Sequence, residues 1–121
     1  MNKHVCNAIL ITCMDFRLQK YLEDWARDNI GEKNYDRVAV AGGVFDQEFV
    51  LKMVQLSSKL HAIKKVVLVN HEDCGGYGVE GTFERHCQDL TEVKKKIQQQ
   101  LPHLQVYAYY LHLDGKFEQV G

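Results

Sequence analysis

Prolines, basic clusters and long apolar stretches are all scarce in this sequence. It contains a single proline and has a formal net charge of −1. Because leucine, valine and isoleucine are plentiful, this composition argues against extended disorder. No stretch approaches the roughly 18 apolar residues of a membrane span, and the balanced charge lacks the basic excess of a nucleic-acid-binding domain. We therefore expect neither a membrane nor a nucleic acid as a partner.

The N-terminal residues also lack the pattern of an export signal. The apolar run over residues 5–12 is interrupted by Asn7 and followed at once by Asp15 and Arg17, so we do not interpret it as a signal peptide. Without such a signal, the four cysteines are expected to be thiols or metal ligands rather than a disulfide framework. The sequence thus predicts a cytoplasmic protein.

The length of the chain limits its organisation. Its 121 residues correspond to one domain by the usual relation of length to domain number, so we expect residues 1–121 to form a single domain. A compact domain of this size often gains stability by pairing with a copy of itself. We therefore expect a homodimer or a higher homo-oligomer.

Apolar, β-branched runs alternate with helical patterns along the chain. This alternation is typical of βαβ units around a mainly parallel sheet. We expect a three-layer α/β fold, with four parallel strands, a short C-terminal antiparallel strand after the Asp114-Gly115 turn, and helices on both faces. The expected strands cover residues 5–12, 37–41, 65–70, 105–113 and 117–120, and the expected helices cover 18–30, from the cap Asp46 to about 60, and from the cap Thr82 to 101.

Two short motifs follow strand-like runs and contain most of the reactive side chains. Residues 13–17 read Cys-Met-Asp-Phe-Arg after the first expected strand, and residues 71–76 read His-Glu-Asp-Cys-Gly-Gly after the third. Ligands of open α/β sheets bind beyond the carboxyl ends of the strands, so two neighbouring strands would bring these motifs together. Cys13, His71 and Cys74 are good zinc ligands, and three ligands leave one tetrahedral position open, as in catalytic zinc sites.

Asp15 and Arg17 suggest a pair of charged groups beside this open position. Cys13, Asp15 and Arg17 share one face of an extended segment, but Cys13 and Arg17 lie too far apart to touch one ion. We expect Asp15 to accept a hydrogen bond from a zinc-bound water and Arg17 to hold Asp15 through two parallel hydrogen bonds. Zinc lowers the pKa of bound water to about 7. Two thiolate ligands make that water harder to deprotonate, so we expect activity to favour alkaline pH.

The two motifs resemble those of the β-class carbonic anhydrases. The matched residues are Cys13, Asp15 and Arg17 of the family's Cys-x-Asp-x-Arg, and His71, Cys74 and Gly75 of its His-x-x-Cys-Gly. Residues 41–43, Ala-Gly-Gly, resemble the turn after the family's second strand, and residues 107–120 resemble its closing strand and hairpin. The resemblance therefore covers nearly the whole chain.

The resemblance implies a zinc enzyme that converts carbon dioxide and water reversibly to bicarbonate and a proton. In this picture Cys13, His71 and Cys74 bind zinc, which carries the attacking hydroxide. Asp15 and Arg17 form the catalytic pair. In part of the family the aspartate moves onto the zinc when its arginine partner is lost, and Asp15 is expected to be capable of the same movement.

Three glycines are candidate substrate contacts, namely Gly42, Gly43 and Gly75. Gly42 and Gly43 precede the helix capped by Asp46 and could present backbone N–H groups to bicarbonate. A tight turn that needs small residues explains the same pair. Both interpretations remain open from the sequence.

The sequence departs from the family pattern at several positions. Phe16 replaces a usual serine, Ala39-Val40 replaces Arg-Asn, and Asn70 replaces a common glycine. The resemblance also indicates a short member without the family's N-terminal helical arm. Two alternatives to carbon dioxide hydration therefore stay open: hydrolysis of carbonyl sulfide or carbon disulfide at the same zinc site, and a non-catalytic zinc-binding homologue.

The remaining cysteines and histidines show no metal-ligand spacing. Adjacent helical residues project in different directions, so we expect Cys87 in the core and His86 at the surface. Cys6 is expected to pack within the sheet. The histidines without ligand-spaced partners are His4, His61, His103 and His112. The apolar residues near the motifs, which are expected to form a wall for a small uncharged substrate, are Phe16, Val44, Phe45 and Tyr77.

Overall fold

A five-stranded sheet forms the centre of the computed structural model, which describes residues 4–121. The strands are β1 (Ala8–Thr12), β2 (Tyr35–Ala39), β3 (Lys65–His71), β4 (Gln105–Leu111) and β5 (Phe117–Val120). Their order across the sheet is β2-β1-β3-β4-β5. The first four strands are parallel, and β5 pairs antiparallel with β4. The predicted fold class is confirmed.

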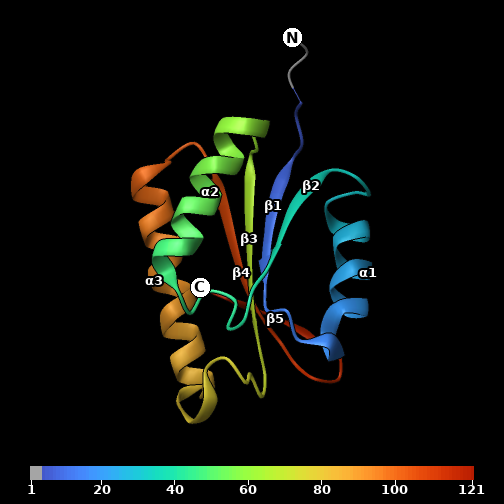
Figure 1. Cartoon of the computed structure of the whole chain (residues 1–121), viewed down its shortest axis with the longest axis vertical. Helices are drawn as coiled ribbons and strands as arrows, with labels where there is room; N and C mark the ends of the chain where they lie inside the picture. Colours follow the sequence, from blue (N-terminus) through green and yellow to red (C-terminus); the bar gives the residue numbers. More distant parts are fainter. Residues whose placement is uncertain (1–3) are drawn as a thin grey trace.

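Helices cover both faces of this sheet (Figure 1). The helix α1 (Gln19–Asn29) lies on one face, and α2 (Gln47–His61) and α3 (Phe83–Gln100) lie on the other. Alternate residues of β1 pack into two hydrophobic cores, one on each face of the sheet. Leu10 packs toward α1, whereas Ile9 and Ile11 pack toward α2 and α3. The central strands are thus buried on both faces, as expected for parallel strands between helices.

Two short 3-10 turns and two helix caps complete the chain path. The turn η1 (Phe16–Leu18) precedes α1, and η2 (Gly78–Glu80) precedes α3. Asp46 and Thr82 cap α2 and α3 as predicted, because their side chains accept hydrogen bonds from backbone N–H groups of the first helical turn.

Several strand boundaries differ from the predictions by up to three residues, including the start of β1 and the end of β2. β1 begins at Ala8, so Cys6 precedes the strand instead of packing within it. The backbone N–H of Cys6 donates to the carbonyl of His61 at 3.1 Å rather than to a neighbouring strand. β2 ends at Ala39, because the following residues turn through Gly42 and Gly43, which have φ angles of 86° and 60°.

The centre of the sheet is the place where the strand order reverses. The chain leaves β1 toward β2 on one side, whereas β3 lies on the other side of β1. Ile11 of β1 lies opposite Leu68 of β3, so the carboxyl ends of these two strands are neighbours. This is the position at which open α/β sheets bind ligands.

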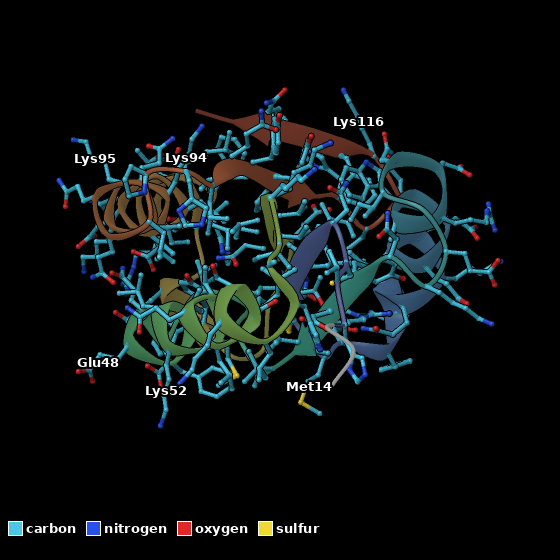
Figure 2. All side chains as sticks on the ribbon, turned by 90° about the horizontal axis from the view of Figure 1, so that it is seen from above. Met14, Glu48, Lys52, Lys94, Lys95 and Lys116 are labelled. Atoms are coloured by element: carbon cyan, nitrogen blue, oxygen red, sulfur yellow. The ribbon has the colours of Figure 1, made fainter. Side chains whose placement is uncertain are left out.

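The periphery is polar and mixed in charge. Figure 2 shows Glu48 and Lys52 of α2, Lys94 and Lys95 of α3, and Lys116 of the β4–β5 turn extending outward from separate elements. Within residues 4–121, the helices lack the combination of length and apolar character that crossing a membrane requires.

Candidate metal centre

Three potential metal ligands meet at the carboxyl ends of β1 and β3. The Sγ atoms of Cys13 and Cys74 lie 3.9 Å apart, and one ligand atom from each of Cys13, His71 and Cys74 lies within 4.8 Å of the other two. All three side chains are buried. The adjacency of β1 and β3 therefore brings together the three residues that the sequence motifs indicated. We call this group the carboxyl-end cluster.

The imidazole of His71 is oriented by a backbone carbonyl. Its Nδ1 lies 2.7 Å from the carbonyl oxygen of Glu72, and because a carbonyl can only accept, Nδ1 carries the proton. Nε2 then keeps its lone pair, and this buried atom has no hydrogen-bond partner in the described part of the chain. A buried polar atom without a partner is costly. Two thiols and one imidazole nitrogen are a donor set suited to zinc, so these residues fit that ion.

The two thiols differ in their electrostatic surroundings. Hydrogen bonding with Cys74 lowers the pKa of Cys13 against the opposing effect of burial, and the nearby His71 and the backbone of Gly42 lower it further. The same interaction with Cys13, together with burial, raises the pKa of Cys74. Cys13 is thus the first thiol to ionise, and Cys74 holds the proton that a binding metal would displace.

Asp15 lies at the edge of the cluster and is held there by Arg17. Arg17 donates from Nη2 to Asp15 Oδ2 at 2.7 Å and from Nε to Oδ1 at 3.1 Å, which is a bidentate pair. These hydrogen bonds lower the pKa of Asp15 to about 2, so the side chain stays ionised. Its Oδ2 lies 4.0 Å from His71 Nε2. The carboxylate therefore borders the cluster while remaining bound to the guanidinium.

Arg17 also connects the two motifs, through a residue that the sequence analysis did not single out. Its Nη1 donates to Asp73 Oδ2 at 3.1 Å, and its Nη2 donates to the Asp73 carbonyl at 3.0 Å. A guanidinium has more donors than one carboxylate can accept. The remaining N–H donors of Arg17 and the position of Asp73 inside the second motif could have indicated this contact from the sequence.

The backbone N–H groups of Gly42 and Gly43 have partners inside the protein. Gly43 donates to the carbonyl of Val40 at 3.1 Å, and the Gly42 backbone hydrogen bonds to Cys13. Both glycines have φ angles that other residues rarely adopt. The tight-turn interpretation therefore accounts for this pair.

The turn at Gly42 packs closely against the loop that contains Cys74. A Cβ atom on Gly76 would lie only 2.6 Å from the backbone nitrogen of Gly42, so this approach requires a glycine. A Cβ atom on Gly75 would meet nothing within 4 Å. Gly75 thus borders open space next to Cys74.

Asn70 joins these loops through a buried hydrogen-bond network. Its Oδ1 accepts from the backbone N–H of Val44 at 3.0 Å, and its Nδ2 donates to Tyr77 Oη at 3.0 Å and to His86 Nδ1 at 2.8 Å. Tyr77 in turn donates to Asp89 at 2.8 Å. From the sequence, Asn70 was noted only because it replaces a common glycine. A glycine has no side chain and could make none of these contacts.

The prediction that His86 lies at the surface is wrong, because its side chain is fully buried. Burial lowers the pKa of His86 to about 4, so the ring is neutral at physiological pH. His86 continues the buried stripe of α3, a helical spacing that could have revealed its position. That stripe contains Leu90, Val93 and Ile97.

The predicted apolar wall forms only in part. Val44 and Tyr77 are buried, but Phe45 is 41% exposed and Phe16 is 85% exposed. Phe16 points outward because its neighbours Asp15 and Arg17 face the cluster. Only part of the expected wall is therefore available to a substrate in a single subunit.

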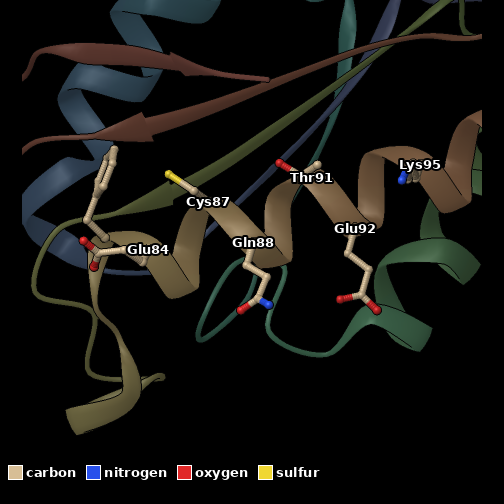
Figure 3. A pocket seen from close by; sticks show the side chains of 7 residues that line it. Glu84, Cys87, Gln88, Thr91, Glu92 and Lys95 are labelled. Carbon is tan, nitrogen blue, oxygen red and sulfur yellow. The ribbon is translucent and has the colours of Figure 1, made fainter.

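A surface hollow of about 770 Å³ lies along α3 (Figure 3). In the close-up, Cys87 and Thr91 point toward the strands, whereas Gln88 and Glu92 point away from them. Cys87 is half-buried at this hollow rather than fully enclosed in the core. The lining residues are Phe83, Glu84, Cys87, Gln88, Thr91, Glu92 and Lys95, and this set offers no imidazole to accompany the thiol.

Solved structures with similar architecture are carbonic anhydrases. A carbonic anhydrase from Glaciozyma antarctica is similar with a TM-score of 0.72 and 17% identity, covering 100% of this chain and 85% of that chain. A chain from the crystal structures of two tetrameric β-carbonic anhydrases of Sordaria macrospora is similar with a TM-score of 0.67 and 12% identity, covering 98% of this chain and 82% of that chain. The chain has the β-carbonic anhydrase fold.

Sequence comparison agrees with this fold. A family model described as "Putative carbonic anhydrase" matches residues 2–121. The chain therefore belongs to this carbonic anhydrase family. An uncharacterized protein of Rickettsia bellii is 26% identical, over 94% of this chain and 81% of that protein.

Proposed function

We propose that this protein catalyses the reversible hydration of carbon dioxide to bicarbonate in a single domain, with zinc held by Cys13, His71 and Cys74. One observation carries the proposal. The buried Nε2 of His71 faces two thiols and finds no hydrogen-bond partner among residues 4–121. Membership of the carbonic anhydrase family supports the reaction, and this ligand geometry supports the metal.

Each residue around the cluster has a distinct part in the proposed mechanism. Zinc, when bound, supplies a Lewis acid that makes hydroxide available near neutral pH. The Glu72 carbonyl fixes the ring of His71. Asp15 is ionised and can only accept, so it takes the hydrogen bond of the reacting water and directs the oxygen lone pair toward carbon dioxide. Arg17 keeps Asp15 in place.

Product bicarbonate is placed beside Gly75, where the backbone borders open space next to Cys74. The proton of the hydration reaction leaves to solvent or buffer. The ligand thiols need a reducing compartment to stay free of disulfides, and we therefore place the protein in the cytoplasm. Gly42 and Gly43 shape this space through their turn rather than through amide contacts to the substrate.

We also propose that the protein is a homodimer or a higher homo-oligomer. Met14, Phe16 and Val79 are 62%, 85% and 99% exposed, and exposed apolar side chains mark a protein interface where they form a contiguous patch. The similar Sordaria macrospora enzymes are tetrameric. Sedimentation velocity should show an oligomer that Phe16→Ser weakens, whereas Leu56→Ser, at another exposed apolar position, leaves it intact.

Zinc content and carbon dioxide hydration, measured on the same preparations, test the proposed function. We expect a zinc equivalent that Cys74→Ser removes, and stopped-flow hydration above buffer at alkaline pH. Asp15→Asn should keep that zinc and lose about 10- to 100-fold in rate, the usual effect of removing a group next to a metal. Asp28→Asn is the matched control, since Asp28 is an exposed aspartate of α1, and it should change neither quantity.

Other results of these two measurements would support the alternative functions. If zinc binds but hydration does not exceed buffer, sulfide release from carbonyl sulfide would identify the hydrolase alternative. Zinc without either activity would identify a non-catalytic zinc protein. If Cys74→Ser does not change the zinc content, the proposed site itself is wrong.

A further inference from the structure

A second group of potential metal ligands lies at the opposite end of the sheet. Cys6 precedes β1, Asp36 is near the start of β2, and His61 ends α2. One ligand atom from each of these three residues lies within 4.8 Å of the other two. We call this group the amino-end cluster.

The two clusters are well separated. Figure 1 shows the start of β1 and the end of α2 at the same end of the molecule as the N-terminus, away from the carboxyl ends of the strands. Cys6 and Cys13 flank β1, and at about 3.3 Å per residue they are on the order of 20 Å apart. The amino-end cluster is therefore a separate site and not a part of the carboxyl-end cluster.

Backbone hydrogen bonds hold the three segments of the amino-end cluster together. The Cys6 N–H donates to the His61 carbonyl at 3.1 Å, and the next residue, Asn7, accepts at its carbonyl from the N–H groups of Lys64 and Lys65 at 2.9 and 3.1 Å. The chain before β1 is thus fixed against the end of α2. The proximity of Cys6 and His61 follows from the fold and does not depend on side-chain rotation alone.

The carboxylate of the amino-end cluster is already oriented. Asp36 Oδ2 accepts from Ser57 Oγ at 2.6 Å and lies 2.7 Å from His61 Nδ1. Carboxylates that bind metals are usually held by such outer hydrogen bonds. All three potential ligands are half-buried, and a hollow of about 190 Å³ beside them provides access from solvent.

The donor types favour a particular class of ion. A thiolate and an imidazole select zinc and similar transition metals over calcium and magnesium, which prefer oxygen ligands. One thiolate and one carboxylate would balance the charge of a divalent cation. Lys33 lines the same hollow and opposes a cation, but the two anionic ligands outweigh its single charge.

A second imidazole lies near His61 and borders the same hollow. The ring of His4 is 6.4 Å from the ring of His61, measured between centroids, and His4 lines the same hollow as Cys6. We propose that Cys6, Asp36 and His61, with His4 as the fourth ligand, form a second binding site for a zinc-class divalent ion. This site is independent of the proposed carbon dioxide chemistry.

Cysteine, histidine and aspartate also form nucleophilic triads, but the geometry here does not favour one. In such triads the thiol hydrogen bonds to the imidazole that activates it. Cys6 Sγ instead donates to the carbonyl of Ala8 at 3.6 Å. The cluster is therefore better suited to a metal than to nucleophilic catalysis.

Cobalt(II) titration of the apoprotein tests the second site. We expect two equivalents in the wild type, and one in either Cys6→Ser or Cys74→Ser, with thiolate-to-cobalt charge-transfer absorption retained in both variants. The double variant should bind none. Cys87→Ser, which alters a half-buried cysteine outside both clusters, should still bind two. His4→Ala should weaken the second equivalent by at least about 10-fold.

A measurement on the unaltered protein guards against variants that fail to fold. Zinc should protect Cys6 from alkylation by iodoacetamide, scored by mass spectrometry against the rate for Cys87 in the same sample. A wild type whose only equivalent is unaffected by Cys6→Ser, a second equivalent that survives Cys6→Ser, or equal alkylation of Cys6 with and without zinc would each overturn the proposal. Any of these results would reduce the cluster to a structural hydrogen bond between His61 and Asp36.

Discussion

The carboxyl-end and amino-end clusters both combine cysteine with histidine but are built in different ways. At the carboxyl end, Cys13, His71 and Cys74 come from two motifs on adjacent strands and are buried. At the amino end, Cys6, Asp36 and His61 come from three separate segments and are half-buried. Burial of the ligands limits exchange with water, so we expect the carboxyl-end cluster to bind metal more tightly than the amino-end cluster.

The imidazoles of the two clusters give a second reason to expect different metal affinities. His71 uses Nδ1 to bond a backbone carbonyl that is not itself a ligand, which leaves Nε2 available. His61 uses Nδ1 to bond Asp36, which is one of the proposed ligands. A metal at the amino end must therefore compete with the hydrogen bond between His61 and Asp36. A metal at the carboxyl end instead gives the buried Nε2 of His71 its first partner. Preorganisation of this kind decides affinity more than the number of donors.

The largest expected effect is the loss of the carboxyl-end metal in Cys74→Ser. The substitution keeps the size of the side chain but replaces the thiol, so we expect hydration to fall by more than about 100-fold, beyond the range of outer-shell changes. The amino-end metal should remain, which zinc analysis would show as one equivalent instead of two. Loss of both equivalents would indicate that the two clusters are coupled and would break the comparison.

A second prediction uses the imidazole behind the carboxyl-end cluster. The pKa of buried His86 is lowered from 6.5 to about 4, so the unfolded chain binds more protons than the folded protein between these pH values. The free energy of unfolding should therefore fall by roughly 3 kcal/mol as the pH decreases from 6.5 to 4. His86→Gln should remove this part of the pH dependence.

Thermal denaturation followed by circular dichroism across this pH range would measure the effect. His103→Gln is the control, because His103 is exposed and its substitution should leave the pH profile unchanged. If His86→Gln and wild type lose stability in parallel, the neutral buried state of His86 is not the cause of the acid sensitivity.

Much of the fold followed from the sequence because its periodicities are strong. β3, with its apolar run over residues 66–69, and the caps Asp46 and Thr82 lie where they were predicted. The start of β1 did not follow, because Val5 and Cys6 are apolar enough to extend a strand across Asn7. The backbone of this segment bonds instead to Asn34, His61 and Lys64, which are distant in the sequence.

The two clusters differ in how visible they are in the sequence. Cys13, His71 and Cys74 lie in short motifs at strand ends, and parallel neighbours must bring such ends together. Cys6, Asp36 and His61 are far apart in the chain, and no spacing rule links the segment before a strand to the last turn of a helix. His86 was misplaced for a third reason, because its polar side chain outweighed a helical spacing that continues the buried stripe of α3.

A third, smaller effect is expected at Asn70, which supports the carboxyl-end cluster. Asn70→Ala would leave the buried N–H of Val44 without its acceptor and remove the donor to Tyr77. We expect a loss of about 2 kcal/mol in the free energy of unfolding, measured by urea denaturation. Asn29→Ala, at an exposed position of α1, should cost less than half as much. Equal losses would show that the Asn70 network does not stabilise the loops around the metal.

The smallest expected effect is at Ser57, which supports the amino-end cluster in the way that Glu72 supports the other one. Ser57→Ala removes the hydrogen bond to Asp36 Oδ2, which should cost about 1 kcal/mol of stability. It should also weaken the second cobalt equivalent by about 10-fold, because the carboxylate loses its fixed orientation.

The neighbouring Ser58 provides the matched control for this last prediction. Ser58 is half-buried in the same turn of α2, and Ser58→Ala should leave cobalt binding at both clusters unchanged. The first equivalent should stay the same in both variants, since its imidazole is oriented at the other end of the sheet by the backbone of Glu72. If Ser57→Ala weakened both equivalents equally, the orientation of Asp36 would not be what distinguishes the two sites. The difference in affinity would then have to come from burial alone.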